Sequence, residues 1–309
     1  INTILVAATG IVFATIIGVI VGISRLSKNL LVRKFAGFYV ELFRNLPLLL
    51  QIFFWYYAAL RLLPLPQDTT GIFGSFYLTI KGLYTPALIW ENLSTFIYVF
   101  IFSIITIIAL RFYARKIQEE EGKQIPVIPI SISILIIFPL LTFIFGDVEA
   151  NIIYPELKEL SASSYFFEGG LEIPPEFIAL ILALSIYTAT FIAECVRAGI
   201  LGISKGQKEA ASSIGLNQKQ ILKLIVLPQA LRIIIPPTTN QYLNLTKNSS
   251  LAAAIAYPDL VLVFAGTALM QTGKAIEIIT MIMFTYLTLS ITISIFMNWY
   301  NKKIAIKEK

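Results

Sequence analysis

Few side chains in this sequence could perform covalent or acid–base chemistry. The chain has no histidine, the commonest general base and metal ligand, and a single cysteine, Cys195. One cysteine excludes an internal disulfide and a cysteine-based metal site. The Gly-Lys pairs at 122–123 and 273–274 lack both the upstream glycine and the following hydroxyl of a phosphate-binding loop. The sequence therefore predicts no catalytic residue, no metal site and no ATPase site of its own.

The composition indicates an integral membrane protein. Hydrophobic residues make up 57% and charged residues 14% of the chain, whereas soluble domains average about 25% charged residues. The first apolar stretch begins at Ile1 without a basic region or a cleavage site, so we expect a span of a chain trimmed at its start and not a signal peptide. Stretches near bilayer length lie at 2–24, 38–63, 93–112, 126–146, 176–199, 229–256 and 275–299. The sequence predicts an all-α membrane protein with about seven spans.

The basic residues indicate which loops face the cytoplasm. Most of the 24 basic residues follow the first and third stretches, surround residues 200–228 or form the C-terminal tail. These loops alternate with acidic ones, of which the longest covers residues 147–175. By the positive-inside rule, we expect loop 200–228 and the C terminus to be cytoplasmic. The net charge of +6 then reflects loops at the lipid surface, and we expect no nucleic-acid partner.

Loop 200–228 contains signals for two short helices. Ser204 and Gln207 have the spacing of a capping box, which predicts a helix from about Lys205. Gly215 is the residue type that ends a helix in a left-handed turn. A second cap pattern at 217–220 predicts another helix that runs on to Pro228.

The first of these helices needs a surface to pack on. Ala210, Ala211 and Ile214 share one face, and the small alanines would let a partner approach closely. A helix of about ten residues is marginal when it is isolated in water. We therefore expect this face to dock against another protein.

The same loop resembles a known motif. Its residues stand at the spacing of the EAA motif in the permease subunits of ATP-binding-cassette (ABC) importers, and seven fixed positions match by chance on the order of once in ten million. The matching residues are Glu209, Ala210, Ala211, Gly215, Ile225, Leu227 and Pro228. The stretches 39–57 and 228–255 resemble the histidine/glutamine permease branch, which takes up polar amino acids. A generic amphipathic loop or a DNA-reading helix-turn-helix explains the pattern less well, since bilayer-length stretches flank it.

The resemblance implies a MetI-like fold in which residues 1–309 form a single transmembrane permease domain. Its five-helix core would cover 1–63 and 176–300, with loop 200–228 coupling it to an ATPase. An inserted membrane hairpin at 93–146 and a periplasmic acidic segment at 147–175 would enlarge the middle of the chain. This enlarged middle resembles the permeases of general L-amino acid importers, or of glutamate, glutamine, aspartate and asparagine importers. We expect the hairpin to be lipid-facing decoration.

The resemblance also implies partners in the bacterial inner membrane and on both of its sides. The expected partners are a second permease, similar but not identical, two cytoplasmic ATPase subunits that bind ATP and Mg²⁺, and a periplasmic amino-acid-binding protein. The chain itself would hold no cofactor. ATP-driven closure of the ATPases would push on the docked helix and switch the access of the central cavity. The residues implied in this coupling are Ser204, Glu209, Ala210, Ala211, Ile214, Gly215, Leu227 and Pro228.

A polar run after Pro236 and Pro237 is the candidate substrate path. Two consecutive prolines remove two amide donors, so we expect a broken helix whose polar residues face a cavity. Lys247 could attract the carboxylate of a zwitterionic amino acid, or it could lie at the outer lipid interface. The polar candidates beside it are Asn240, Asn244, Thr246 and Ser249.

Charged and small residues at helical spacing predict contacts inside the membrane part. Glu41 precedes Arg44 by three residues, and Glu194 precedes Arg197 by three. We expect interfacial ion pairs here and favour that role over one in transport. The small residues at 18 and 22 could let one helix pack closely against another.

Two other classes of function remain open. A stand-alone secondary transporter would also have about seven spans and broken helices, but it would need no ATPase and gives no reason for the EAA loop. A membrane scaffold could dock a cytosolic protein through this loop without moving a substrate. Uptake into vesicles distinguishes a scaffold from a transporter, and purification with or without an ATPase distinguishes the two transporters.

Overall fold

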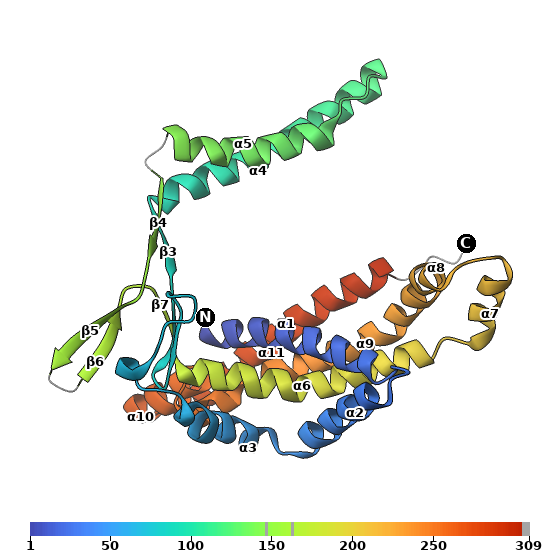
Figure 1. Ribbon diagram of the computed structural model, residues 1–309. Helices are drawn as coiled ribbons and strands as arrows, with labels where there is room; N and C mark the ends of the chain where they lie inside the picture. The colour runs from blue at the N-terminus through green and yellow to red at the C-terminus, as the bar shows by residue number, and fades with distance from the viewer. Residues whose placement is uncertain (146–147, 162–163, 305–309) are drawn as a thin grey trace. The chain divides into compact units, whose positions relative to one another are not determined.

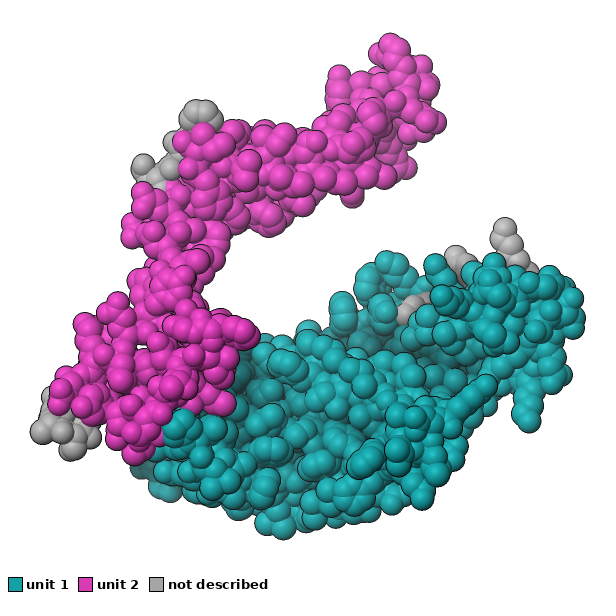
Figure 2. Space-filling view, viewed as in Figure 1, with its two compact units in different colours: residues 1–64, 79–82, 173–309 teal, residues 65–78, 83–172 magenta. Residues whose placement is uncertain are grey.

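The computed structural model describes residues 1–145, 148–161 and 164–304. The chain divides into two compact units, which Figure 2 colours separately. The first unit comprises 1–64, 79–82 and 173–309, and the second comprises 65–78 and 83–172. Three stretches lie outside the described residues. They are 146–147, where the predicted hairpin meets the acidic segment, 162–163 in the acidic segment, and 305–309 in the C-terminal tail.

Helix α6 (Pro175–Leu201) is the central helix of the first unit. It packs against α1 (Asn2–Ser24), α2 (Leu30–Asn45), α3 (Leu48–Phe53) and α9 (Leu227–Asn248) (Figure 1). The fully buried side chains Leu180, Leu184 and Ile192 lie along α6 and form the middle of the apolar core. Helix α11 (Ala275–Ile304) packs on α9 and keeps most of its apolar side chains exposed, as expected of a helix that faces lipid or a partner.

Small residues on α1 bring it close to α6. A Cβ atom on Gly18 would lie 2.7 Å from the Cβ of Ile192, and one on Gly22 would lie 2.7 Å from the carbonyl oxygen of Ala193. Distances this short leave room for hydrogen only. The predicted close packing at these two residues is therefore confirmed, and the helix that they contact is α6 of the same chain.

The predicted span at 38–63 is divided in the structure. Helix α2 ends at Asn45, and Leu46 and Pro47 are extended before α3 begins. The residue before a proline avoids the helical conformation, which ends α2 at this point. The side-chain amide of Gln51 donates to the carbonyl oxygens of Phe43 (2.8 Å) and Leu46 (3.1 Å), so the helix end is satisfied within the protein. The π-helical turn η1 (Phe54–Ala59) and the 3₁₀ turn η2 (Leu60–Leu62) then continue α3.

The remaining predicted spans are helical. Among the described residues, six helical stretches are long and apolar enough to cross a membrane, and Leu48–Leu62 and Leu262–Thr272 are shorter apolar helices. The stretch Leu262–Thr272 combines the π-helical η6 (Leu262–Ala268) with α10 (Leu269–Thr272), and sequence analysis did not predict it.

The prediction of a broken helix at Pro236 and Pro237 is wrong. Helix α9 continues through both prolines to Asn248, and the geometry changes only there, to the 3₁₀ helix η5 (Ser249–Ile255). A proline removes one helical hydrogen bond but does not by itself end a helix whose neighbouring turns are held by packing. Ala230, Ile234 and Leu245 bury the flanking turns. The irregular part lies instead before Pro228, in the π-helical η4 (Ile221–Val226).

The second unit contains the predicted hairpin, with helices α4 (Leu93–Glu121) and α5 (Val127–Phe145) packed on each other. Gly122 ends α4 in the left-handed conformation, with φ of 68°. Short strands, which sequence analysis did not predict, join this hairpin to the rest of the unit. Two antiparallel pairs form, β3 (Ala87–Glu91) with β4 (Glu149–Ile153) and β5 (Glu156–Ser161) with β6 (Ser164–Glu168). A three-stranded sheet has the strand order β1 (Tyr77–Thr79), β2 (Gly82–Thr85), β7 (Leu171–Ile173).

Aromatic packing holds the strands of the second unit. Phe167 is buried, and its ring centroid lies 4.6 Å from those of Tyr77 and Tyr84. The Tyr84 hydroxyl donates to Glu172 (3.4 Å), and burial together with this carboxylate raises the pKa of Tyr84 to about 12.

Candidate functional site

The loop after α6 folds into the two predicted short helices. Helix α7 (Lys205–Ser213) is followed by Gly215, whose φ of 84° lies in the left-handed region. Helix α8 (Gln218–Gln220) begins with a complete capping box, because Asn217 Oδ1 accepts from Gln220 N (3.0 Å) and Gln220 Oε1 accepts from Asn217 N (2.9 Å). The predicted glycine elbow and second cap are therefore confirmed.

Two details of the predicted loop are wrong. Ser204 occupies the N-cap position of α7, but its hydroxyl makes no cap hydrogen bond, so the first capping box does not form. The second helix does not stop at Pro228, since α8, η4 and α9 continue one another and Pro228 lies in the first turn of α9. Pro228 lies just after the π-helical η4, where the helical hydrogen-bond pattern is already irregular.

The two faces of α7 have different surroundings. Ala211 is buried in a core cluster with Ile221 and Val226, which attaches α7 to the chain itself. Ala210 and Ile214 point away from this cluster, and Ile214 is 77% exposed. The expected docking face is thus divided: Ala211 supports the loop, and Ala210 and Ile214 are free for a partner.

Glu209, the first residue of the EAA motif, is exposed on α7. Its backbone carbonyl accepts from the Ser213 hydroxyl (3.0 Å), which closes the last turn of the helix. Its carboxylate forms no ion pair with any residue that the structure describes, although basic residues are frequent in this loop. The carboxylate is therefore available to a basic group outside the chain.

Tight helix packing lies directly behind the loop. A Cβ atom on Gly199 of α6 would overlap Ile234 Cγ1 on α9. One on Gly202 would lie 3.2 Å from Ile233 Cδ1. The helix that enters the loop and the helix that leaves it are therefore in close contact beside the loop. In the motif's last positions, Leu227 is exposed and Pro228 is half-buried.

The ion pair predicted at the end of α6 is present and has a third member. Glu194 accepts hydrogen bonds from Arg197, with Nε at 3.1 Å, and from Arg25 at the end of α1. Sequence analysis missed Arg25 because the two residues are 169 positions apart. The pair expected between Glu41 and Arg44 does not form among the described residues, where both side chains are exposed.

The five candidates for the substrate path divide between two faces of α9 and its continuation η5. Asn240, Asn244 and Lys247 lie on one exposed face. Thr246 and Ser249 are buried on another, and their hydroxyls donate to the carbonyl oxygens of Tyr242 (2.9 Å) and Thr246 (2.7 Å). Because Thr246 and Ser249 are buried, only the first three expose a polar group to a molecule beside α9.

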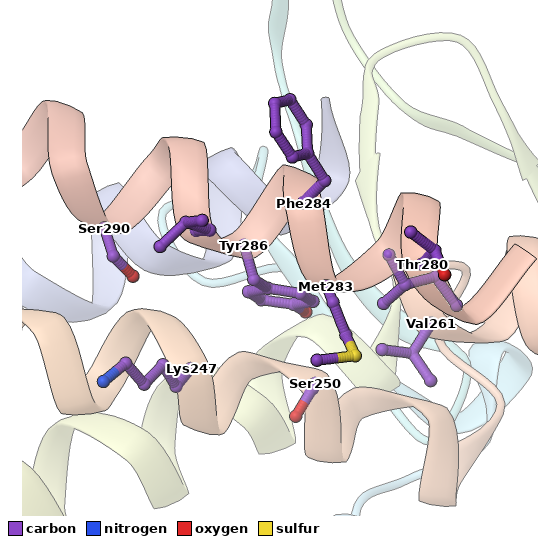
Figure 3. Close-up of a pocket in the computed structure, with 10 residues that line it drawn as sticks. Lys247, Ser250, Val261, Thr280, Met283, Phe284, Tyr286 and Ser290 are labelled. Atoms are coloured by element: carbon purple, nitrogen blue, oxygen red, sulfur yellow. The ribbon is translucent and has the colours of Figure 1, made fainter. Parts of the chain in front are cut away.

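A cavity of about 780 Å³ lies between α9 with η5 and the middle of α11 (Figure 3). Its polar groups come from Lys247, Ser250, Thr280, Tyr286 and Ser290, and Met283 is among its apolar side chains. Sequence analysis had no reason to select the α11 residues, because isolated serine, threonine and tyrosine residues are common in apolar helices. Lys247 is the one residue of the predicted path that lines this cavity.

Hydrogen bonds fasten the far end of the first unit. The Asn2 side chain donates to the carbonyl oxygen of Pro258 (3.0 Å), and Thr3 Oγ1 accepts from Leu260 N (2.9 Å). In the same loop, buried Asp259 accepts from Leu262 N (2.8 Å) and from the Tyr286 hydroxyl (3.4 Å). Burial raises the pKa of Asp259. This loop thus joins α1 to α11 at the end of α6 opposite the EAA loop.

Comparison with known proteins identifies the family. Residues 125–306 match the family described as binding-protein-dependent transport system inner membrane component. The chain is 47% identical over 309 residues to the general L-amino acid transport system permease protein AapQ of Rhizobium johnstonii, across 100% of this chain and 76% of AapQ. It is 37% identical over 321 residues to the glutamate/glutamine/aspartate/asparagine transport system permease protein BztB of Rhodobacter capsulatus, across 92% of this chain and 73% of BztB.

The fold agrees with this family. A crystal structure of an amino acid ABC transporter with histidines superposes with a TM-score of 0.56 at 17% identity, covering 98% of this chain and 90% of that chain. The resemblance drawn from the EAA motif and the fold class are therefore confirmed, and the family is one of transport subunits, in which the ATPase is a separate subunit. The chain belongs to the binding-protein-dependent transport system inner membrane components and is a multi-pass permease subunit of an ABC importer.

Proposed function

We propose that this permease moves L-amino acids across the bacterial inner membrane, with glutamate, glutamine, aspartate and asparagine among them. The identity of 47% to AapQ across the whole chain carries this proposal, and BztB supports the narrower set of substrates. The periplasmic partner would be an amino-acid-binding protein. A second permease, similar but not identical, would complete the membrane part.

In the proposed complex, α7 and the C terminus face the cytoplasm and two ATPase subunits bind ATP and Mg²⁺. Glu209, Ala210 and Ile214 dock into an ATPase, while Ala211 and Gly215 hold α7 in place on its own chain. The exposed apolar tip at Ile214 and the unpaired Glu209 carboxylate support this division of roles among the described residues. Closure of the ATPases displaces α7, and the tight contact of Gly199 with Ile234 carries the displacement to α6 and α9 together.

The proposed organisation is one permease domain over residues 1–309. Its core covers 1–63 and 176–300, and the hairpin at 93–146 and the acidic segment at 147–175 are insertions. The coupling loop covers 200–228. The division of the chain into two compact units close to these bounds supports this organisation.

The cavity between α9 and α11 is the proposed substrate path. Its volume of about 780 Å³ falls in the range of about 300–1,000 Å³ that holds small ligands. The Lys247 ammonium would attract the substrate carboxylate, and Asn240 and Asn244 continue the same polar face of α9. The buried Thr246 and Ser249 would shape the path from behind.

Uptake into proteoliposomes tests this function. The permease, its partner permease and the ATPases are reconstituted with MgATP enclosed in the vesicles, and the binding protein is added outside with labelled L-glutamate or L-glutamine. We expect uptake that requires ATP and that other unlabelled L-amino acids reduce. Lys247→Met should raise the KM for uptake while binding of the ATPases is unchanged.

Two results would contradict the proposal. Uptake driven by an ion gradient in vesicles that contain no ATPase would show a secondary transporter. Stable binding of the ATPases without uptake of any L-amino acid, in a complex that hydrolyses ATP, would show a docking scaffold.

A further inference from the structure

The charged end of the α4–α5 hairpin has one basic residue more than it has acidic ones. Between residues 111 and 123 each glutamate is engaged by one basic side chain. Arg115 pairs with Glu119 (3.2 Å), Lys116 with Glu120 (3.7 Å) and Lys123 with Glu121 (2.9 Å). Arg111 alone among these basic residues has no hydrogen bond or ion pair with any residue that the structure describes. Its guanidinium is a cation without a counter-ion in the described part of the chain.

This unpaired arginine lines a cavity. A space of about 450 Å³ lies between the last turns of α4 and the start of α5. From α4 it is lined by Arg111, Arg115 and Gln118, which are spaced to lie on one helix face. Gln124 from the turn adds a further amide. Arg115 engages Glu119 through Nε, so the ends of its guanidinium fork remain for another acceptor.

The other side of the cavity is apolar. Ala114 is buried, and Ile125, Val127 and Ile128 come from the turn and the first residues of α5. The site therefore combines strong donors for an oxyanion with a surface that suits a hydrocarbon chain. A soluble anion would contact the hydrogen-bond donors but would not need the apolar surface.

The depth of the cavity agrees with this combination. Residues 93–110 of α4 carry no charge, and 18 residues of helix span about 27 Å at about 1.5 Å per residue. The hydrocarbon core of a bilayer is about 30 Å thick. Arg111 thus lies at the boundary where lipid phosphates lie, and the uncharged stretch of α5 begins at Val127 on the same level.

We propose that the hairpin binds the phosphate of an anionic phospholipid in this cavity. Arg111 and Arg115 donate to the phosphate oxygens, Gln118 and Gln124 complete its hydrogen bonds, and the apolar side receives the first part of an acyl chain. An anionic lipid is favoured over a zwitterionic one because the described residues leave the Arg111 charge uncompensated, whereas a zwitterionic headgroup brings its own cation. The inserted hairpin then senses the composition of the membrane.

Native mass spectrometry of the delipidated full complex tests the site with phosphatidylglycerol as the probe. We expect phosphatidylglycerol to bind at least about tenfold more tightly than phosphatidylethanolamine, because the ammonium of phosphatidylethanolamine offsets the phosphate charge that the arginines attract. The double variant Arg111→Gln and Arg115→Gln should remove most of this preference. Arg111→Lys, which keeps the charge but loses the bidentate geometry, should fall between the two.

Lys116→Gln is the matched control. It removes one positive charge from the same helix, as each of the two arginine substitutions does, but it lies outside the cavity, so phosphatidylglycerol binding should not change. Equal losses in Lys116→Gln and in the double variant would overturn the proposal, as would equal binding of the two lipids. Displacement of the lipid by inorganic phosphate would also overturn it, since the site would then bind a free anion. ATP-dependent uptake by each variant confirms that the complex remains folded.

Discussion

Gly199 and Ile234 meet so closely that α6 and α9 have no space for a methyl group between them. We predict that Gly199→Ala lowers the stability of the permease by about 1–3 kcal/mol, because overpacking pushes the two helices apart. Thermal unfolding in detergent measures this loss. Gly37→Ala on α2 is the control, since no atom lies within 4 Å of the added Cβ. A Gly199→Ala variant as stable as Gly37→Ala would show that α6 and α9 can move apart at little cost in free energy.

Ile214 is the exposed apolar tip of α7 and should dominate docking to an ATPase. Ile214→Asp should weaken association with the ATPases by about tenfold or more, since a carboxylate cannot be buried in an apolar groove without a partner. Co-purification and substrate-stimulated ATPase activity measure the effect. Ser212→Asp places the same charge on another exposed position of α7. If both variants bind the ATPases alike, Ile214 is not in the interface.

Substitutions of Gly215 test whether the turn after α7 requires a left-handed backbone conformation or the absence of a side chain. Its φ is 84°, but no atom lies within 4 Å of an added Cβ. Asparagine enters the left-handed region at little cost, whereas a β-branched residue loses about 1–2 kcal/mol or more there. Gly215→Asn should therefore retain uptake, and Gly215→Val should lose most of it. Comparable uptake by the two variants would contradict a conformational role.

Glu194 joins Arg25 and Arg197, so its replacement should cost more than that of either arginine. Glu194→Gln leaves two half-buried guanidinium groups facing a neutral amide, whereas Arg25→Gln leaves the Glu194–Arg197 pair intact. We expect a lower melting temperature for Glu194→Gln than for Arg25→Gln. Glu41→Gln, which removes an exposed carboxylate that pairs with no described residue, should leave it unchanged. Identical melting temperatures for all three variants would show that the cluster is not structural.

Local signals in the sequence were sufficient where the structure depends on adjacent residues. The cap at Asn217 and Gln220 and the left-handed Gly215 follow from residue type and spacing alone. Ser204 has the same cap spacing, yet its hydroxyl makes no cap hydrogen bond. Spacing makes such a bond available, but the local path of the chain decides whether it forms.

Structural features that depend on contacts between residues far apart in the sequence could not be predicted from it. Pro236 was expected to break α9, but burial of the flanking turns against other helices holds the helix together. Arg25 reaches Glu194 across 169 positions, and the α11 side chains meet Lys247 only in the folded bundle. The membrane spans themselves were predictable, since bilayer length and hydrophobicity suffice, except at 38–63, where the extended Leu46 and Pro47 divide the apolar stretch.

The bonds of Asn2 and Thr3 to the loop at 258–260 bear on how the protein is made. The carbonyl that Asn2 contacts belongs to a residue 256 positions further along the chain. At about 5–20 residues per second, a ribosome needs on the order of 10–50 s to reach it. Throughout that interval α1 lies in the bilayer, and the side chains of Asn2 and Thr3 form hydrogen bonds with water or lipid instead of with this loop. The core therefore closes only after residues 258–260 have been synthesised, and a ribosome stalled before Pro258 would leave α1 without these hydrogen bonds.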